Sequence, residues 1–319
     1  MPTKVISKLT MTLRIARRTA DNRVLIFRPK ENASRMAYSA EAVSMPPVPE
    51  SLFLQAVHMA VAKNAKFIPP HDFHGSLYIR PLQFGSSCQI GLEPPDEYIF
   101  CVFVQPHIAF HGHGVALKAL VAEDFDRAAT RGTGHVKVGG NYAPVIKWSR
   151  EAKREENGGW NVLLHVDSKT QTYVDEFSTS GFIGIVGTLA PQEANDDPGL
   201  AEEETVAPKV VLADSPACIK SITSDCVEAL AISLGWSVER RQVKLDELGD
   251  FSEVMAAGTA AGLVPIKCIY HKSSDKLYEF SGNEVRDFLW ERLLKIQRGE
   301  EPDAFGWCEE LRWDEFRDA

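Results

Sequence analysis

The most constraining feature of the sequence is a lysine set between two glycine-rich turns, in the run Gly132-Thr-Gly-His-Val-Lys137-Val-Gly-Gly-Asn-Tyr142. Its glycines accept backbone conformations that other residues disfavour and let the main chain approach a flat ring closely. Such a run is suited to hold an amine at the bottom of a cleft. Desolvation and nearby cations lower the pKa of a lysine toward the neutral form that condenses with an aldehyde. The run therefore suggests a Schiff-base lysine, with a solvated loop lysine as the alternative.

The composition predicts a globular protein of two domains. The chain has 319 residues, of which 44% are hydrophobic and 25% charged, so it is long enough to bury a full core. Its net charge of −9 argues against a nucleic-acid partner, because phosphate neutralisation needs a concentrated basic surface. Small anionic substrates remain possible, since a few placed arginines can bind them.

The sequence favours a cytoplasmic location. No apolar run approaches the length of about 18 residues that suggests a membrane span, and the N-terminus lacks the apolar region of a signal peptide. Residues 1–18 carry five basic and no acidic side chains, which is typical of organelle transit peptides. A mitochondrial location is therefore the alternative.

No metal site is expected. The six cysteines form no C-x-x-C pair and no metal-ligand spacing, so we predict reduced thiols. His107, His111 and His113 could be proposed as metal ligands. No acidic or cysteine partner lies near them in the sequence, so we expect solvated histidines.

The order of expected elements indicates an α/β fold. Strands are expected at 24–27, 76–80, 98–104, 160–166 and 182–186, and helices at 51–66, 142–156, 224–234 and 283–298. Turn-forming residues over 105–115 suggest an interdomain linker. The predicted domains are therefore a small N-terminal α/β domain at 1–104 and a large C-terminal domain at 116–319. We expect the acidic segment at 190–204 to form a surface loop.

Six segments of the chain resemble one enzyme family. The lysine run resembles the lysine motif of branched-chain amino acid aminotransferases, which are class IV pyridoxal-phosphate enzymes. Five other segments resemble that family in the same order. They are Asn32-Ala-Ser-Arg-Met36, Leu77-Tyr-Ile-Arg-Pro81, Glu176-Phe-Ser-Thr179, Ser221-Ile-Thr-Ser224 and Gly258-Thr-Ala260. The resemblance covers roughly residues 20 to 300. It implies a mixed α/β fold of two domains, the D-amino acid aminotransferase-like fold, also called fold type IV.

The resemblance also implies a reaction and a cofactor. The reaction is transfer of the amino group of a branched-chain or similar apolar L-amino acid to 2-oxoglutarate, with pyridoxal 5'-phosphate as cofactor. Lys137 would bind the cofactor as an aldimine and later carry the proton. Tyr142 would face the phenolate oxygen of the cofactor. Glu176, followed by Thr179, would keep the pyridine nitrogen protonated. Asp175 is the neighbouring competitor for that role.

The phosphate and the substrate would be held by further segments. Ile222 and Thr223 would offer backbone N–H groups at a helix start. Arg35 would add a charge and Thr259 a hydroxyl group, and Arg127 matches a family arginine near the phosphate. The implied substrate pocket is formed by Tyr78, Arg80, Tyr142, Thr259, Ala260, Ile90 and Leu92. The last two fall where the family's interdomain loop reaches across the interface of a homodimer.

The chain departs from the family pattern in two places. The family usually has Gly, Val, Thr and Arg where this chain has residues 221–224, so this chain lacks the glycine and the local cation of the family pattern. We expect Arg131 to be a surface residue. The N-terminal part is shorter than in relatives, and residues 11–19 stand where relatives carry a strand that lines the substrate pocket. We expect an edge strand there that places arginines at 14, 17 and 18 in or beside the pocket, with weaker turnover of branched-chain substrates.

Two other interpretations remain open. The chain could keep the cofactor and act as a lyase, or as an aminotransferase for a different amine. It could also be a shortened, non-catalytic relative. The sequence does not distinguish primary amino acid metabolism from a specialised biosynthesis.

Overall fold

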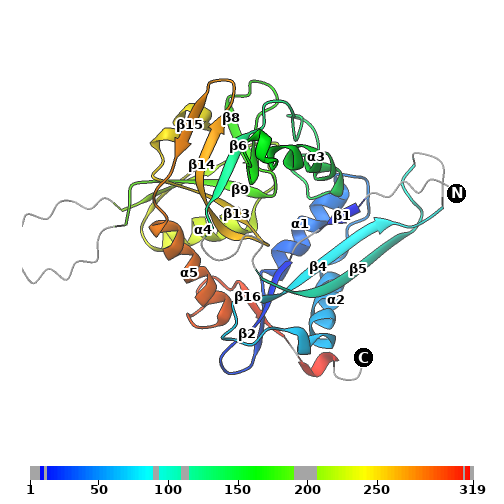
Figure 1. The fold of residues 1–319 in the computed structure, drawn as a ribbon. Coiled ribbons are helices and arrows are strands. Elements are labelled where there is room, and N and C mark those ends of the chain that lie inside the picture. Colours follow the sequence, from blue (N-terminus) through cyan, green and yellow to red (C-terminus); the bar gives the residue numbers. More distant parts are fainter. Residues whose placement is uncertain are drawn as a thin grey trace, which may run out of the picture.

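The chain folds around two β-sheets. The computed structural model describes residues 8–10, 13–88, 93–108, 115–189, 207–311 and 313–316. One sheet has six strands and the other ten. They lie beside each other, with helix α1 (Pro29–Glu41) at their junction (Figure 1). Ile90, Leu92, His111, His113 and the acidic segment 190–204 lie outside the described residues.

The first sheet is antiparallel, in the order β1-β4-β2-β3-β16, with β5 paired to β4. Its strands are β1 (Lys8–Thr10), β2 (Leu13–Arg18), β3 (Val24–Phe27), β4 (Ser76–Gly85), β5 (Tyr98–His107) and β16 (Cys308–Glu310). Side chains alternate between the faces of a strand. Leu77 and Ile79 therefore share one face of β4, where they are buried in the core formed with α1 and α2 (Glu50–Lys63). Tyr78 and Arg80 lie on the other face.

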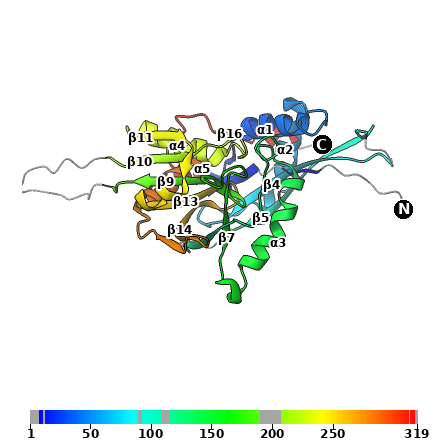
Figure 2. The same ribbon diagram turned by 90° about the horizontal axis from the view of Figure 1, so that it is seen from above.

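The second sheet closes partly on itself. Its order is β11-β10-β9-β13-β14-β6-β7-β8-β12, and β8 also pairs with β9, so six strands form a ring. Figure 2 shows strands β11, β10, β9, β13 and β14 in this sequence across the sheet. The strands are β6 (Leu117–Val121), β7 (Val162–Val166), β8 (Tyr173–Phe177), β9 (Ser180–Val186), β10 (Lys209–Ala213), β11 (Ser237–Arg241), β12 (Val243–Lys244), β13 (Glu253–Gly258), β14 (Gly262–His271) and β15 (Lys276–Glu279), which pairs with β14.

The remaining helices pack against the second sheet. They are α3 (Ala143–Ala152), α4 (Ile222–Ser233) and α5 (Glu284–Arg298). Short 3-10 turns occur at Ala65–Phe67, Gly139–Asn141, Glu155–Asn157, Leu245–Asp250 and Trp313–Phe316. Helices α4 and α5 bury an apolar core against β9, β10 and β13. No described helix has the length and apolar character needed to cross a membrane.

The predicted elements all exist, but several boundaries differ. The helix expected to run to residue 66 ends at Lys63. Strand β5 was expected to end at 104 and continues to His107, so the predicted linker begins inside a strand. Among the described strands β5 pairs only with β4 and so lies at an edge of the sheet, where proline is tolerated within a strand.

The prediction for the basic strand near the N-terminus is wrong. Strand β2 lies between β4 and β3, not at an edge. Arg17 donates a hydrogen bond to the carbonyl of Gly75 at 2.8 Å, and Arg18 donates one to the carbonyl of Ala65 at 2.9 Å. Both guanidinium groups therefore bind loop carbonyls of the first sheet, so Arg17 and Arg18 do not enter the lysine site. The side chain of Arg14 lies outside the described residues.

The end of the chain returns to the first sheet. Strand β16 pairs with β3, although sequence analysis assigned residues 116–319 to one domain. The boundary at 105–115 stays a proposal. All six cysteines are free in the structure.

Candidate active site

The Lys137 loop is held by helix α1. Val136 and Val138 are buried in a small apolar cluster with residues at and after the C-terminal end of α1. The backbone N–H of Lys137 donates to Ser39 Oγ at 3.0 Å. A side chain at Gly134 would place its Cβ 2.4 Å from the carbonyl oxygen of Ala217, so this turn requires glycine. These contacts fix the backbone on both sides of the lysine.

The amine of Lys137 lies in a desolvated, positively charged environment. Its Nζ donates a hydrogen bond to Tyr142 Oη at 2.8 Å. Burial is the main reason that the pKa of Lys137 is lowered to about 7. The charges of Arg35, Arg127 and Arg80 contribute to this lowering, and the charge of Glu176 opposes it. A large fraction of this amine is therefore neutral near pH 7, as nucleophilic attack on a carbonyl requires.

A buried acid faces the lysine. Glu176, on β8, forms an ion pair with Arg127, with 2.5 Å between Glu176 Oε1 and Arg127 Nη2. Both side chains are almost fully buried. Burial raises the pKa of Glu176 to about 7, while the charges of Arg127 and Lys137 oppose this shift. Arg127 also donates to the carbonyls of Gly134 and Ala217, at 3.2 and 2.7 Å.

The contacts of Arg127 do not test its expected role. The resemblance implies that Arg127 matches a family arginine near the phosphate, and this expectation stays a prediction. The structure places its guanidinium against Glu176, because a buried guanidinium needs buried acceptors and the carboxylate and two carbonyls supply them.

Asp175 is buried beside Glu176, and burial raises its pKa. The charge of Asp175 is not among the main influences on the pKa of Lys137, whereas that of Glu176 is.

Thr179 is exposed in the turn after β8, and its carbonyl lies near Gly258. The 176–179 and 258–260 segments therefore adjoin each other.

The start of α4 forms a site suited to an anion. Ser221 caps the helix by accepting a hydrogen bond from the N–H of Ser224 at 3.2 Å, although the family pattern has glycine there. Ile222 and Thr223 are buried in the first turn, where helix N–H groups have no partner inside the helix. Unpaired N–H groups and the helix dipole together favour bound anions.

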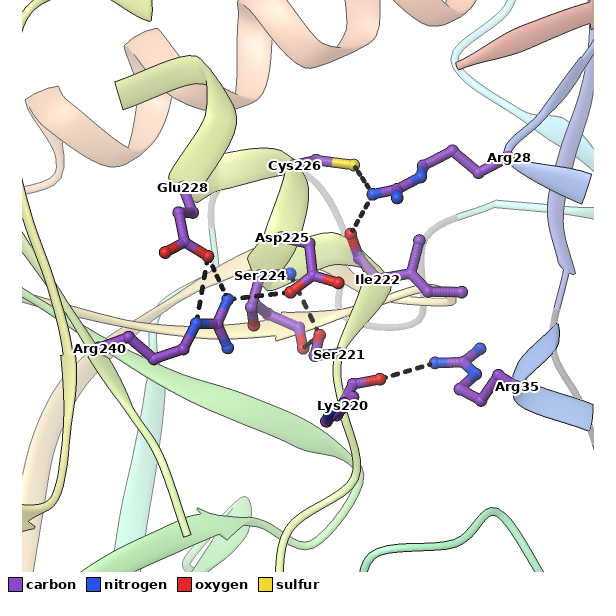
Figure 3. Close-up of polar contacts among 11 residues, drawn as sticks. Arg28, Arg35, Lys220, Ser221, Ile222, Ser224, Asp225, Cys226, Glu228 and Arg240 are labelled. Atoms are coloured by element: carbon purple, nitrogen blue, oxygen red, sulfur yellow. Dashed lines mark hydrogen bonds and ion pairs between the residues drawn. The ribbon is translucent and has the colours of Figure 1, made fainter. Parts of the chain in front are cut away.

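Two arginines of the first sheet region reach this helix start (Figure 3). Arg35 Nη1 donates to the carbonyl of Lys220 at 3.3 Å, and its Nε is buried with no hydrogen-bond partner among the described residues. Arg28 donates to the carbonyl of Ile222 and to Cys226 Sγ, both at 3.4 Å. Sequence analysis missed Arg28, which belongs to none of the six segments.

The other side of the site joins the two sheets. Thr259 and Ala260 form the half-buried turn between β13 and β14. Across from it, Arg80 Nη2 donates to Tyr78 Oη at 2.9 Å, and the guanidinium lies 5.1 Å from the centre of the Tyr78 ring. His107 contacts the carbonyl of Ala260 at 3.1 Å. Sequence analysis considered this histidine only as a metal ligand or a solvated linker residue.

A cavity of about 580 Å³ lies beside Glu176 and the loop before α4, and Lys137, Arg80 and Thr259 are not among the described residues that line it. Its lining includes Gly132, His135, Asp175, Glu176, Lys220 and Ser221. Arg131, expected at the surface, is exposed and lines the same cavity. This volume is in the range of small-molecule sites. In the described part of the chain no group of three or more His, Cys, Asp or Glu side chains could hold a metal ion.

Comparison with known proteins identifies the family. A family model described as amino-transferase class IV matches residues 12–269. The chain belongs to the class IV aminotransferases. Among similar proteins, "Aminotransferase TOXF" of Cochliobolus carbonum is 64% identical over 302 residues, which cover 94% of this chain and 81% of that protein. "Aminotransferase apf4" of Gibberella fujikuroi is 58% identical over 303 residues, with coverages of 95% and 77%.

Solved structures confirm the predicted fold of this class IV aminotransferase. The branched-chain amino acid aminotransferase of Escherichia coli superimposes with a TM-score of 0.73 at 21% identity, covering 96% of this chain and 90% of that one. The enzyme of Thermoproteus uzoniensis, solved with norvaline, has a TM-score of 0.75 at 19% identity, with coverages of 96% and 90%. Class IV aminotransferases depend on pyridoxal phosphate, so the predicted cofactor and fold type IV are both confirmed.

Proposed function

We propose that this class IV aminotransferase transfers the amino group of a branched-chain or similar apolar L-amino acid to 2-oxoglutarate, with Lys137 as its catalytic residue. The observation that carries the proposal is the Lys137 amine, with its pKa lowered to about 7 and its Nζ 2.8 Å from Tyr142 Oη. When bound, pyridoxal phosphate supplies an aldehyde that exchanges the amino group and a ring that stabilises negative charge.

The residues fit this cofactor. The Nε of Arg35 is buried without a hydrogen-bond partner among the described residues, and the first turn of α4 presents backbone N–H groups; both are suited to a phosphate group. Glu176 is a buried carboxylate suited to pair with a protonated ring nitrogen. The proposed cofactor ligands are Arg35, Lys137, Tyr142, Glu176, Thr179, Ile222, Thr223 and Thr259. Arg127 then acts behind Glu176, where its charge favours the ionised carboxylate.

The face of β4 and β5 supports the proposed substrates. Tyr78 and Phe103 bring aromatic rings close to Arg80, whose guanidinium lies 5.1 and 6.0 Å from the two ring centres. Among the described residues Arg80 has no acidic partner within ion-pair distance. The rings suit an apolar side chain, and the unpaired charge suits the distal carboxylate of 2-oxoglutarate. The N–H groups of Thr259 and Ala260 would bind the carboxylate that both substrates share.

Arg80→Gln should raise the KM for 2-oxoglutarate by about ten- to a hundredfold, the effect of removing a hydrogen bond to a charged group. The KM for leucine should change by less than about threefold, because leucine has no distal carboxylate. Initial rates with one substrate varied at a time measure both constants. Arg131→Gln is the matched control and should leave both unchanged. Equal effects of Arg80→Gln on the two substrates would contradict the assignment.

The neutral amine of Lys137 predicts a pH dependence of cofactor capture. The rate at which stripped protein binds pyridoxal phosphate should rise with pH to about 7 and then level off, because Lys137 loses its proton there. A solvated lysine, with its ordinary pKa of 10.5, would continue to gain neutral amine at higher pH. Stopped-flow absorbance measures the rate, with Nα-acetyl-lysine as the solvated control. A protein rate that follows the control above pH 8 would contradict the lowered pKa.

The experiment that tests the proposed function is a panel of amino donors and oxo acid acceptors. Leucine, isoleucine and valine with 2-oxoglutarate should give higher kcat/KM values than charged donors. Release of ammonia without an acceptor would instead indicate a lyase. Transfer from a charged or aromatic amine alone would indicate an aminotransferase of different specificity, and no transfer from any donor would indicate a non-catalytic relative.

We also propose that the functional unit is a homodimer. Ile99 and Phe103, on β5, are 44% and 45% exposed and lie on the same face of the first sheet as Arg80. A second copy covering this face would bury both side chains and exclude water from the substrate side. The family resemblance implies that Ile90 and Leu92, which lie outside the described residues, reach the partner. Sedimentation velocity should show a dimer that Phe103→Glu dissociates.

A further inference from the structure

His107 connects the two sheets at the proposed substrate pocket. It is the last residue of β5, and its backbone is in register with Ser76 of β4. By strand alternation its side chain shares a face of the sheet with Tyr78, and the two rings lie 5.5 Å apart. Its Nε2 lies 3.1 Å from the carbonyl oxygen of Ala260, in the second sheet.

The acceptor in this contact determines which nitrogen of the His107 imidazole carries a hydrogen. A carbonyl oxygen can only accept a hydrogen bond, so Nε2 of His107 must carry the proton. The neutral ring with hydrogen on Nε2 and the protonated ring both satisfy this requirement. The bond therefore persists in either protonation state.

The acceptor belongs to the turn that the proposed function uses. The N–H groups of Thr259 and Ala260 are proposed to bind the substrate carboxylate. The bond to the Ala260 carbonyl holds the peptide group that directly follows them, and so restrains the turn that presents them. On its other side the His107 ring packs on Tyr78, whose hydroxyl accepts a hydrogen bond from Arg80. One side chain thus connects both halves of the proposed substrate pocket.

We infer that His107 is a positioning residue that holds the Thr259–Ala260 turn at a set distance from Tyr78 and Arg80, and so determines how tightly substrate carboxylates bind. This inference rests on the proposed substrate pocket. Binding energy that orients a substrate is lost when a supporting contact loosens, even where the contact does not touch the substrate.

Two substitutions at His107 separate the hydrogen bond from packing. His107→Phe keeps a ring against Tyr78 and removes the donor. His107→Gln keeps an N–H donor and removes the ring. Cofactor-loaded protein is titrated with two unreactive carboxylates, 4-methylvaleric acid and glutarate, while cofactor absorbance is followed. A separate titration of stripped protein with pyridoxal phosphate gives the cofactor affinity.

We expect His107→Phe to weaken both carboxylates by about three- to tenfold, as for the loss of one neutral hydrogen bond, and His107→Gln to stay within about twofold of the wild type. Cofactor affinity should be unchanged in both variants. Wild-type affinity in His107→Phe, or equal weakening by the two substitutions, would overturn the inference. If the wild type binds glutarate but not 4-methylvaleric acid, the apolar donor of the proposed function is wrong, and the glutarate titrations still test His107.

Discussion

Lys137→Ala should reduce aminotransferase turnover by at least about a thousandfold, because it removes the amine that we propose binds the cofactor and carries the proton. The apolar contacts of Val136 and Val138 do not involve the lysine side chain, so the fold should persist. Steady-state rates with leucine and 2-oxoglutarate measure the loss, and circular dichroism checks the fold.

Lys220→Ala is the matched control for this substitution. Lys220 is exposed, lines the cavity beside Glu176, and belongs to the loop before α4. Its removal should change turnover by less than about threefold, since a surface substitution without a contact to the reacting atoms has little effect. A Lys137→Ala enzyme that retains more than about a tenth of wild-type turnover, a barrier change below about 1.4 kcal/mol, would contradict the role of Lys137.

Glu176→Gln should slow turnover by more than about a hundredfold while cofactor affinity stays nearly unchanged. The amide cannot hold a proton on the ring nitrogen by charge, so the ring loses much of its capacity to stabilise negative charge. The proposed phosphate contacts, at Arg35 and the start of α4, are retained. Absorbance titration measures cofactor affinity, and single-turnover conversion with leucine measures the chemical step.

Asp175→Asn is the control, since Asp175 is buried on the same strand beside Glu176. We expect this variant to remain within about tenfold of the wild type. If the Asp175 substitution is the more damaging one for turnover and Glu176→Gln stays within tenfold, then Asp175 is the acid that acts on the ring.

Sequence reasoning predicted local features well. The strand at 24–27 and the fold type were found from apolar patterning and from the six segments, because both are encoded in short stretches of chain. The 176–179 and 258–260 segments were found in the same way, and the structure brings them together near Gly258.

Contacts between distant parts of the chain were predicted poorly. The pairing of Arg127 with Glu176 and the support of Lys137 by Ser39 depend on tertiary packing, which short motifs do not encode. Arg28 adopts a left-handed backbone conformation, with φ of 48°, that non-glycine residues rarely take. The sequence around Arg28 indicated neither this conformation nor the contact of its side chain with α4. Strand β2 was misplaced for a related reason: periodicity predicts a strand but not its neighbours in the sheet.

The most direct test of the account is to locate the lysine that binds the cofactor. Holoenzyme is reduced with sodium borohydride, which makes the bond between pyridoxal phosphate and its lysine permanent, and the digested protein is mapped by mass spectrometry. The account predicts the phosphopyridoxyl group on the peptide that contains Lys137. Modification of Lys220, or an even distribution over surface lysines, would contradict it.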